Sequence, residues 1–353
     1  MRPARRHLLT NRFAVLSFVA GAGTLACWLG CGIDSVASAV PPETPAQPAQ
    51  PSITISRGRD AASPTTAAST QATTAPVPAV ARAATRPTSR PAEGPTDGPT
   101  VFGLAREHMA AGDLVAAREV LNDALIAGKL SGTETLEAKK QIAEMSKTLV
   151  FSGRRLPGDP WIISHMVEPG EVLAKLGSMN GLTASFLQQI NNVTDARKLR
   201  AGYSIKIVKG PFYAVVTKHA FTMDLYLGAP GGAGSMYVTT YRVGLGTDDS
   251  TPTGTWVVEP GKKLPHPTYY PPAGQGPVIE AEDPKNPLGK YWIGLKGVDG
   301  QSVGRLSYGI HGTIEPESIG KQASLGCIRL LNQDVAQAFG LLVEGKSTVV
   351  VLP

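Results

Sequence analysis

Hydrophobic positions along this 353-residue chain follow three successive patterns. Between residues 101 and 150 they recur every three or four residues, which predicts helices. Between residues 163 and 208, a short apolar run, two helical stretches and a second apolar run predict a strand–helix–helix–strand unit. From residue 211 onward the period becomes two, and clusters of proline and glycine separate the runs. We therefore expect an α+β multidomain protein whose C-terminal part is mostly β.

The helical part, residues 100–152, divides into three predicted helices. Gly112-Asp113 breaks the first apolar stripe, and a third helix begins at Thr133. The pairing of Ala105 with the stripe that starts at Leu114 resembles one tetratricopeptide (TPR) hairpin. Single repeats of that kind rarely stand alone. We therefore interpret this part as a small helical module that packs on its neighbours.

Residues 163–208 carry three short motifs, which read HMVEPGEVLAKLG, INNV and LRAGYSIKI. Thr183 is the predicted cap of the second helix, and Gly202 marks the turn before the last strand. The motifs and the order of elements resemble the LysM domain, a small module that binds glycans containing N-acetylglucosamine. Val172 stands where that family usually has Ser or Thr. The resemblance implies glycan strands as a partner, and a plain structural adaptor is the alternative.

The C-terminal part, residues 211–353, contains several short predicted strands and one helix. The strands cover residues 214–216, 223–227, 237–243, 255–258, 291–295 and 348–352, and the helix covers residues 332–342. Short alternating strands separated by turn residues are typical of a β-sandwich or a barrel. We therefore expect a sandwich-like or barrel-like catalytic domain here.

The N-terminal part combines an export segment with a linker. Basic residues precede an apolar stretch at residues 13–30, and Ala37-Ser38-Ala39 follows it in the manner of a signal-peptidase site. Residues 1–39 are therefore predicted to be a signal peptide or, if retained, a membrane anchor. Cys31 adds lipidation as a third alternative, and each alternative implies export to the periplasm or cell envelope. Residues 40–99 are rich in Pro, Ala and Thr, which predicts a disordered linker.

Charge and cysteine content narrow the chemistry. The formal charge of +6 predicts attraction to polyanions in general. No Lys/Arg run interleaved with aromatic residues accompanies it, so we expect no nucleic-acid partner. Cys27 and Cys31 lie in the export segment, and its cleavage would leave Cys327 as the last thiol. Such a thiol is a buried bystander, an intermolecular linker or a reactive group.

The segment Tyr308–Val335, which reads YGIHGTIEPESIGKQASLGCIRLLNQDV, concentrates reactive chemistry. A histidine such as His311 can take the proton of a cysteine such as Cys327 and return it to a leaving amine. Gly326 allows close approach of the backbone, and the amides around Cys327 can face an oxyanion. In an extended strand Arg329 would share a face with Cys327, where it would lower the thiol pKa or bind a carboxylate.

A histidine and a cysteine could also form part of a metal site. Metal ligation needs further Cys or His residues nearby, and this segment has none. The other histidines are His7, His108, His165, His219 and His266. We therefore expect no metal site and no cofactor.

HGT followed by SLGCIRLLNQD resembles the catalytic motif of the L,D-transpeptidases, the YkuD-type family. TPTGTW at Thr251–Trp256 and NPLGKYWIGL at Asn286–Leu295 support this resemblance. It implies that Cys327 is the nucleophile and His311 its base. Supporting residues by the same resemblance are Tyr308, Gly312, Ser324, Gly326 and Arg329. Leu325 stands where many members have a second histidine.

The resemblance implies a peptidoglycan transpeptidase that needs no cofactor. Cys327 would attack a tetrapeptide stem, expel the terminal D-alanine and pass the acyl group to an amine of a neighbouring stem, giving a 3→3 cross-link. Water, a free D-amino acid or a protein lysine are alternative acceptors, so stem peptides, glycan strands and an acceptor protein are the expected partners. A membrane contact is expected only through a retained N-terminal segment. A sortase-like transpeptidase and an inactive wall-binding scaffold are the alternative functions.

Overall fold

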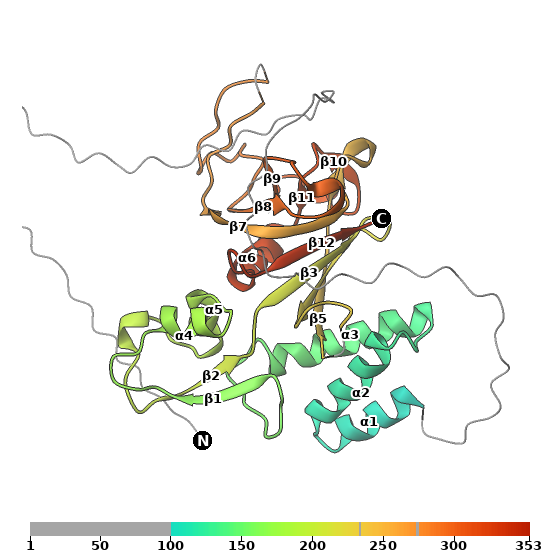
Figure 1. The fold of residues 1–353 in the computed structure, drawn as a ribbon, viewed down its shortest axis with the longest axis vertical. Coiled ribbons are helices and arrows are strands. Elements are labelled where there is room, and N and C mark those ends of the chain that lie inside the picture. The colour runs from blue at the N-terminus through green and yellow to red at the C-terminus, as the bar shows by residue number, and fades with distance from the viewer. Residues whose placement is uncertain (1–99, 233, 273–274) are drawn as a thin grey trace, which may run out of the picture. The chain divides into compact units, whose positions relative to one another are not determined.

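The computed structural model describes residues 100–232, 234–272 and 275–353 (Figure 1). The predictions for residues 1–39 and 40–99 lie outside these residues. All described residues belong to one compact unit. The chain passes from three helices through a unit of two strands and two helices into a mostly-β C-terminal part. Among the described residues, no helix is long and apolar enough to cross a membrane.

The N-terminal helices are α1 (Val101–Ala110), α2 (Leu114–Ile126) and α3 (Gly132–Leu149). Each begins at a polar cap, because the first amides of a helix lack partners within it. The side chains of Thr100 and Asp113 accept hydrogen bonds from Gly103 and Ala116. Ser131 and Glu134 form a reciprocal capping box at α3. The predicted positions of all three helices are confirmed.

The next unit contains β1 (Ile162–Met166), α4 (Leu173–Met179), α5 (Ala184–Ile190) and β2 (Ser204–Val208). Its two strands pair antiparallel, with Ile162 opposite Val208. Thr183 caps α5, as expected, by accepting a hydrogen bond from the Phe186 amide at 3.1 Å. Strand β2 is buried on both faces, because every residue from Ile205 to Val208 is buried.

The C-terminal part is built on one eight-stranded sheet, with the order β11-β9-β8-β7-β12-β3-β4-β5. The strands are β3 (Phe212–Thr217), β4 (Thr222–Leu227), β5 (Met236–Arg242), β7 (Gly254–Pro265), β8 (Tyr291–Gly297), β9 (Tyr308–His311), β11 (Ile328–Arg329) and β12 (Thr348–Leu352). The sheet is mixed, because β12 runs parallel to β3 and β11 parallel to β9. A separate parallel pair joins β6 (Leu245–Gly246) to β10 (Gln322–Ser324).

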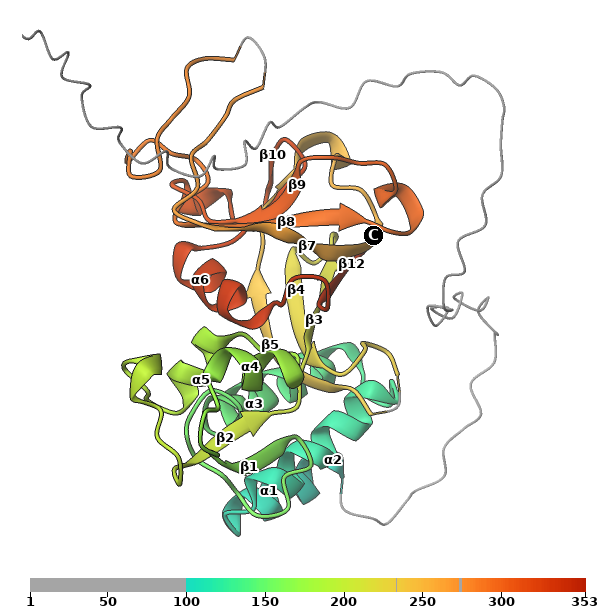
Figure 2. The ribbon, with the colours of Figure 1, turned by 60° about the vertical axis from the view of Figure 1, so that its left-hand side comes forward.

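The C-terminal part is therefore mostly β, as expected, and its strands form one curled sheet with a separate two-stranded pair. Helices cover this sheet in place of a second sheet: α3 packs against β5, and α6 (Asn332–Leu341) packs against β8 and β9 (Figure 2). Beyond the end of β5, the backbone of Gly244 exchanges two hydrogen bonds with Arg329 of β11. The sheet thus curls enough for its two edges to meet at one bridge.

The helical module pairs with the open edge of β5. The Asn122 side chain donates to the Ser235 carbonyl and accepts from the Tyr237 amide, each at 2.9 Å. An exposed strand edge leaves such backbone groups unpaired, and Asn122 satisfies two of them. Lys139 of α3 also lies 2.5 Å from the Asp224 carboxylate on β4. These contacts agree with a helical module that packs on its neighbours.

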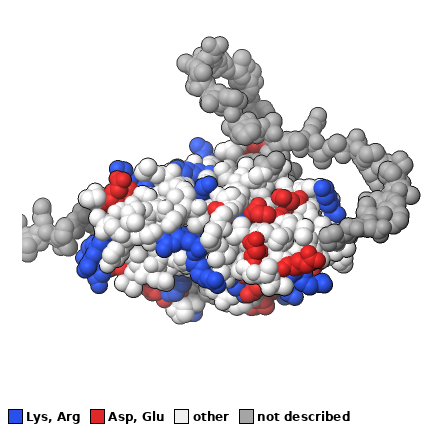
Figure 3. Space-filling view, turned by 90° about the horizontal axis from the view of Figure 1, so that it is seen from below, with Lys and Arg blue, Asp and Glu red and all other residues white. Residues whose placement is uncertain are grey.

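Charged side chains of both signs are interspersed on the face shown in Figure 3. A nucleic-acid surface usually presents a continuous basic stripe.

Candidate active site

The proposed base, His311, lies on β9, and the proposed nucleophile, Cys327, directly precedes the neighbouring strand β11. Strand β11 runs parallel to β9, with Ile328 beside Ile310 and Arg329 beside His311. Side chains alternate between the two faces of a strand. His311 and Arg329 therefore share one face, and Cys327, two residues before Arg329, approaches from the same side. The isoleucines point to the opposite face and are buried in the main core.

An indole ring forms part of this face. Trp292 of β8 pairs with His311, and the two rings stack with centroids 5.8 Å apart. Trp292, Leu288 and Cys327 belong to one small buried cluster. A Cβ atom at Gly309 would lie 2.6 Å from the indole, so this strand position accommodates only glycine. The Trp292 ring thus forms the surface on which His311 stacks and near which Cys327 is buried.

His311 is held in one tautomer by the backbone. Its Nδ1 atom lies 2.6 Å from the Gly312 carbonyl. A carbonyl can only accept, so Nδ1 carries the proton and Nε2 keeps a free lone pair. Burial is the main cause that lowers the pKa of His311 to about 4, with a further lowering by Arg329 and an opposing effect of the Gly312 hydrogen bond. The ring is therefore neutral at pH 7.

The Cys327 thiol is also neutral at pH 7. Its side chain is buried, and Sγ donates a weak hydrogen bond to the Ser307 carbonyl at 3.8 Å. Burial raises the pKa of Cys327 to about 11, against the opposing effects of the Gly309 backbone and the Arg329 charge. Arg329 lowers the thiol pKa, as expected, but desolvation of the thiolate outweighs the field of the guanidinium.

Arg329 has a second charged neighbour that sequence reasoning did not identify. Its Nη1 atom lies 2.9 Å from the Glu315 carboxylate. Its Nε atom is buried and has no hydrogen-bond partner among the described residues. The guanidinium is therefore partly neutralised on one side, and its buried Nε–H is an unpaired donor.

The turn before the cysteine is held from within. The Ser324 hydroxyl donates to the Cys327 carbonyl at 2.6 Å and accepts from the Gly326 amide at 3.1 Å. Gly326 has φ of 126°, and a Cβ atom there would meet the Tyr308 ring at 2.8 Å. Only glycine fits this left-handed, crowded position.

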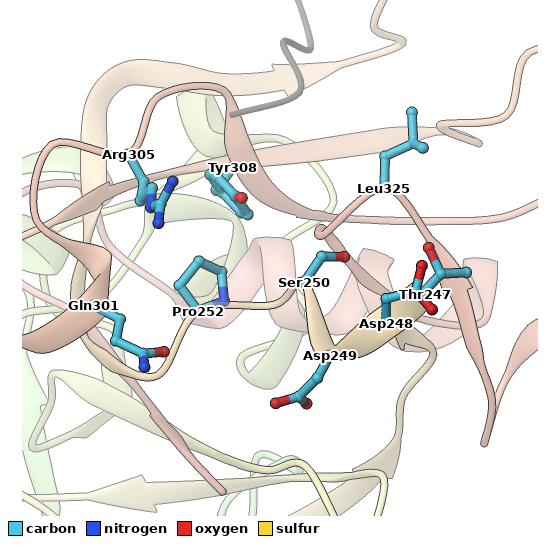
Figure 4. A pocket seen from close by; sticks show the side chains of 9 residues that line it. All are labelled: Thr247, Asp248, Asp249, Ser250, Pro252, Gln301, Arg305, Tyr308 and Leu325. Carbon is cyan, nitrogen blue, oxygen red and sulfur yellow. The ribbon is translucent and has the colours of Figure 1, made fainter. Parts of the chain in front are cut away.

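A pocket of about 330 Å³ opens beside this turn (Figure 4). Its lining residues are Thr247, Asp248, Asp249, Ser250, Pro252, Gln301, Arg305, Tyr308 and Leu325. A second hollow, of about 240 Å³, contains Trp292 and Leu306 and shares Tyr308 with the first. Tyr308 thus lines both hollows. The hydroxyl of Ser250 is buried and has no partner among the described residues.

All residues of the predicted site meet in this one region, and they are Tyr308, His311, Gly312, Ser324, Gly326, Cys327 and Arg329. Sequence reasoning missed Trp292 and Ser307, because their contacts depend on the curl of the sheet. Trp292 lies in the motif NPLGKYWIGL, whereas no sequence signal marks Ser307. His266 lies apart, 2.5 Å from Glu282. Within the described part of the chain, no cluster of three metal-binding side chains occurs.

Residues 212–351 match the family model of the YkuD L,D-transpeptidase catalytic domain. Proteins named L,D-transpeptidase YkuD from Bacillus licheniformis and Bacillus subtilis are 29% and 27% identical to this chain over 192 residues, which is 52% of this chain and 96% of each relative. L,D-transpeptidase YqjB of Bacillus subtilis is 41% identical over 113 residues, which is 31% of this chain and 57% of that relative.

Two solved structures are also similar. An L,D-transpeptidase from Mycobacterium smegmatis matches with 16% identity and a TM-score of 0.29, over 43% of this chain and 64% of its own. LD transpeptidase LdtMt1 in complex with imipenem matches with 16% identity and a TM-score of 0.29, over 42% and 63%. The similarity therefore rests on the family model and on the sequence relatives. Residues 212–351 are similar to the catalytic domain of the L,D-transpeptidases.

Proposed function

We propose that this protein is a peptidoglycan L,D-transpeptidase in which Cys327 is the nucleophile and His311 the general base. The observation that carries this proposal is the shared face of β9 and β11. There, a buried histidine with a free Nε2 lone pair stacks on Trp292, and the buried Cys327 thiol belongs to the same small cluster as Trp292. The matched catalytic domain names the reaction class, and the pair supplies a chemical route to it.

In the first half-reaction, Nε2 of His311 takes the thiol proton as Sγ attacks the carbonyl carbon of the third residue of a tetrapeptide stem. The carbonyl oxygen becomes an oxyanion that nearby backbone amides stabilise. The C–N bond then breaks, and the terminal D-alanine leaves with the proton held by His311. The product is a thioester on Cys327.

In the second half-reaction, a side-chain amine of a neighbouring stem loses a proton to His311 and attacks the thioester. The C–S bond breaks, His311 returns the proton to the sulfur, and a 3→3 cross-link results. Water, a D-amino acid or a protein lysine would follow the same course to hydrolysis, exchange or protein attachment. The free Nε donor of Arg329 offers a hydrogen bond to a substrate carboxylate.

The two neutral groups suit this route. A resting thiol and imidazole do not carry charge, so burial costs little until a substrate arrives. Proton transfer within the pair then creates the thiolate at the moment of attack. A reactive thiolate is thereby absent from the free protein.

The test is intact-mass analysis of the full chain in a Cys27→Ala, Cys31→Ala background, after incubation with tetrapeptide-stem muropeptides or imipenem. We expect one acyl adduct, which peptide mapping assigns to Cys327. The same protein with Cys327→Ala should carry none. A folded protein that has a free Cys327 thiol and forms no adduct would overturn the proposal and favour the wall-binding scaffold.

We further propose that residues 163–208 are a LysM-like module that binds glycan strands. A hollow of about 470 Å³ lies between the end of α5 and β2, and the exposed Tyr203 ring lines it. Aromatic faces of this kind are suited to contact sugar rings. Pull-down of the full chain on insoluble peptidoglycan should weaken with Tyr203→Ala and persist with Tyr203→Phe. Equal binding by the two variants would remove this proposal and leave the structural adaptor.

The N-terminal segment completes the proposal. Export would bring the catalytic domain to its peptidoglycan substrate in the cell envelope, and the linker at residues 40–99 would allow it to reach that substrate. Mass analysis of the protein recovered from producing cells tests this, because cleavage after Ala39 would yield a chain that begins at Val40.

A further inference from the structure

One buried threonine joins the wall of the pocket in Figure 4 to the turn that carries the proposed nucleophile. Thr251 is 2% exposed, and its hydroxyl accepts from the Gly246 amide at 2.9 Å and donates to the Gly326 carbonyl at 3.0 Å. We propose that Thr251 is a positioning residue for acyl transfer: it fixes the Gly326–Cys327 peptide so that the Cys327 amide can stabilise the oxyanion. This inference depends on the proposed function.

The geometry of the peptide group carries the first step. The carbonyl and the N–H of a trans peptide point in opposite directions. Because Thr251 holds the Gly326 carbonyl, the Cys327 N–H points away from Thr251. This N–H has no hydrogen-bond partner among the described residues, whereas the neighbouring Gly326 amide is bound by Ser324. A buried, unpaired amide next to the nucleophilic sulfur is a donor that remains available for a substrate oxygen.

The turn is restrained at both of its carbonyls. Thr251 binds the Gly326 carbonyl, and Ser324 binds the Cys327 carbonyl. A Cβ atom on Gly246 would lie only 2.8 Å from Gly326 Cα, so the two backbones touch with no room for a side chain between them. The Thr251 hydroxyl reaches both strands of backbone at this contact. Free rotation of the peptide is therefore suppressed before a substrate binds.

Thr251 is itself held in place by a buried lysine. Lys218 is 7% exposed, and its Nζ donates to the carbonyls of Thr251 at 2.7 Å and Asp249 at 3.2 Å. Asp248 and Asp249 have φ of 51° and 59°, conformations that side-chain-bearing residues seldom adopt. Lys218 thus stabilises a loop that would otherwise relax. This loop forms one side of the pocket in Figure 4. Lys218 therefore stabilises both the pocket wall and, through Thr251, the position of the Cys327 N–H.

Two reactions of Cys327 separate this role from a general effect on the thiol. Acylation by imipenem passes through an oxyanion, whereas alkylation by iodoacetamide does not. In the full chain without Cys27 and Cys31, we expect Thr251→Val to slow acylation about 10- to 100-fold, part of the loss seen when an oxyanion donor is removed. Alkylation should stay within about threefold, because thiol pKa and access are unchanged. Thr251→Ser keeps the hydroxyl and should restore most of the acylation rate.

The matched control is Thr239→Val, a half-exposed threonine of β5 with no side-chain hydrogen bond to a described residue. Acylation of folded Thr251→Val at the wild-type rate would overturn the inference. A parallel loss of alkylation and acylation would overturn it too, since the hydroxyl would then act on the thiol. If Thr251→Val does not fold, Lys218→Met should show the same divergence of the two rates, and equal changes would contradict the proposal. Whether the wild type is acylated at all tests the proposed function. The ratio of the acylation rate of Thr251→Val to that of the wild type tests the role of Thr251, so the two failures are distinguishable.

Discussion

Buried ionisable side chains occur in two regions of this protein, and the regions differ in whether these groups have partners for their charge. At the module junction, which we define as Arg118, Asp159 and Lys206, buried charges are matched. Arg118 binds Asp159 through two hydrogen bonds of 3.0 and 2.9 Å, and both side chains are almost fully buried. The Lys206 ammonium donates to the carbonyls of Leu149 and Ser152, where α3 ends. Burial still lowers the pKa of Lys206 to about 8.

At the catalytic face, which we define as His311, Cys327 and Arg329, the two reactive groups are buried without a counter-ion. Burial moves both pKa values in the direction that removes charge. The one cation, Arg329, is paired with Glu315 on its outer side. The junction therefore uses charge to join the helices, the linking segment and β2. In the proposed mechanism, the groups of the catalytic face stay uncharged until proton transfer, so burial would serve structure in one region and reactivity in the other.

The largest expected effect concerns the uncharged base. His311→Gln keeps a polar side chain of similar size but removes the lone pair that accepts the thiol proton. Imipenem acylation, followed by intact mass, should fall about 10²- to 10⁴-fold. His266→Gln is the control, because His266 is half-exposed and lies beside Glu282. A His311→Gln protein that is acylated within about tenfold of wild type would show that the thiol does not need this base.

The next effect concerns the matched charges of the junction. Arg118→Met leaves the Asp159 carboxylate buried and unpaired, so the free energy of unfolding in urea should fall by about 3–5 kcal/mol. Replacing both residues by leucine should recover much of that loss. The matched control is Arg197→Met, because Arg197 pairs with Asp195 at the surface. There the loss should be about 0–1 kcal/mol. Equal losses at the two pairs would contradict the contrast between a buried and an exposed ion pair.

The sequence predicted most elements of this fold but not their assembly. Helical spacing and caps such as Thr183 are local signals, and they located the helices correctly. Strands β9 and β11 escaped prediction, because they are short and are defined only by pairing with each other. The choice between a sandwich-like and a barrel-like arrangement stayed open for a related reason. Alternation shows that a strand has a buried face, but does not show whether a helix such as α3 or another sheet covers it.

The candidate site divides in the same way. Its reactive side chains were predicted, because Cys327 and His311 lie in one motif that resembles a known family. The raised pKa of Cys327 was not predicted, because it depends on burial of the thiol beneath the Ser307 segment and beside Trp292. Neither burial nor the Thr251 hydrogen bonds can be inferred from sequence spacing.

The third prediction is a pH dependence of stability that arises from His311. Burial lowers the pKa of His311 from 6.5 to about 4, so the unfolded chain binds this proton at a higher pH than the folded one. Stability is therefore lost as the pH falls from about 6.5 to 4. The shift corresponds to about 3 kcal/mol. Urea unfolding of wild type and His311→Gln across this range should reveal the difference, and parallel curves would show that the folded protein accepts the charged ring without cost.

The smallest effect concerns the ion pair at the edge of the catalytic face. Glu315→Gln removes the carboxylate that partly neutralises Arg329, so the positive potential at the Cys327 sulfur should rise. Because Glu315 is largely exposed, solvent screens most of its charge, and iodoacetamide alkylation should accelerate by about threefold or less. Glu317→Gln is the control, since Glu317 is exposed and has no ion pair with a described residue. A slower reaction in Glu315→Gln would mean that Glu315 acts by holding Arg329 in position, and that position, not charge, governs the field at the thiol.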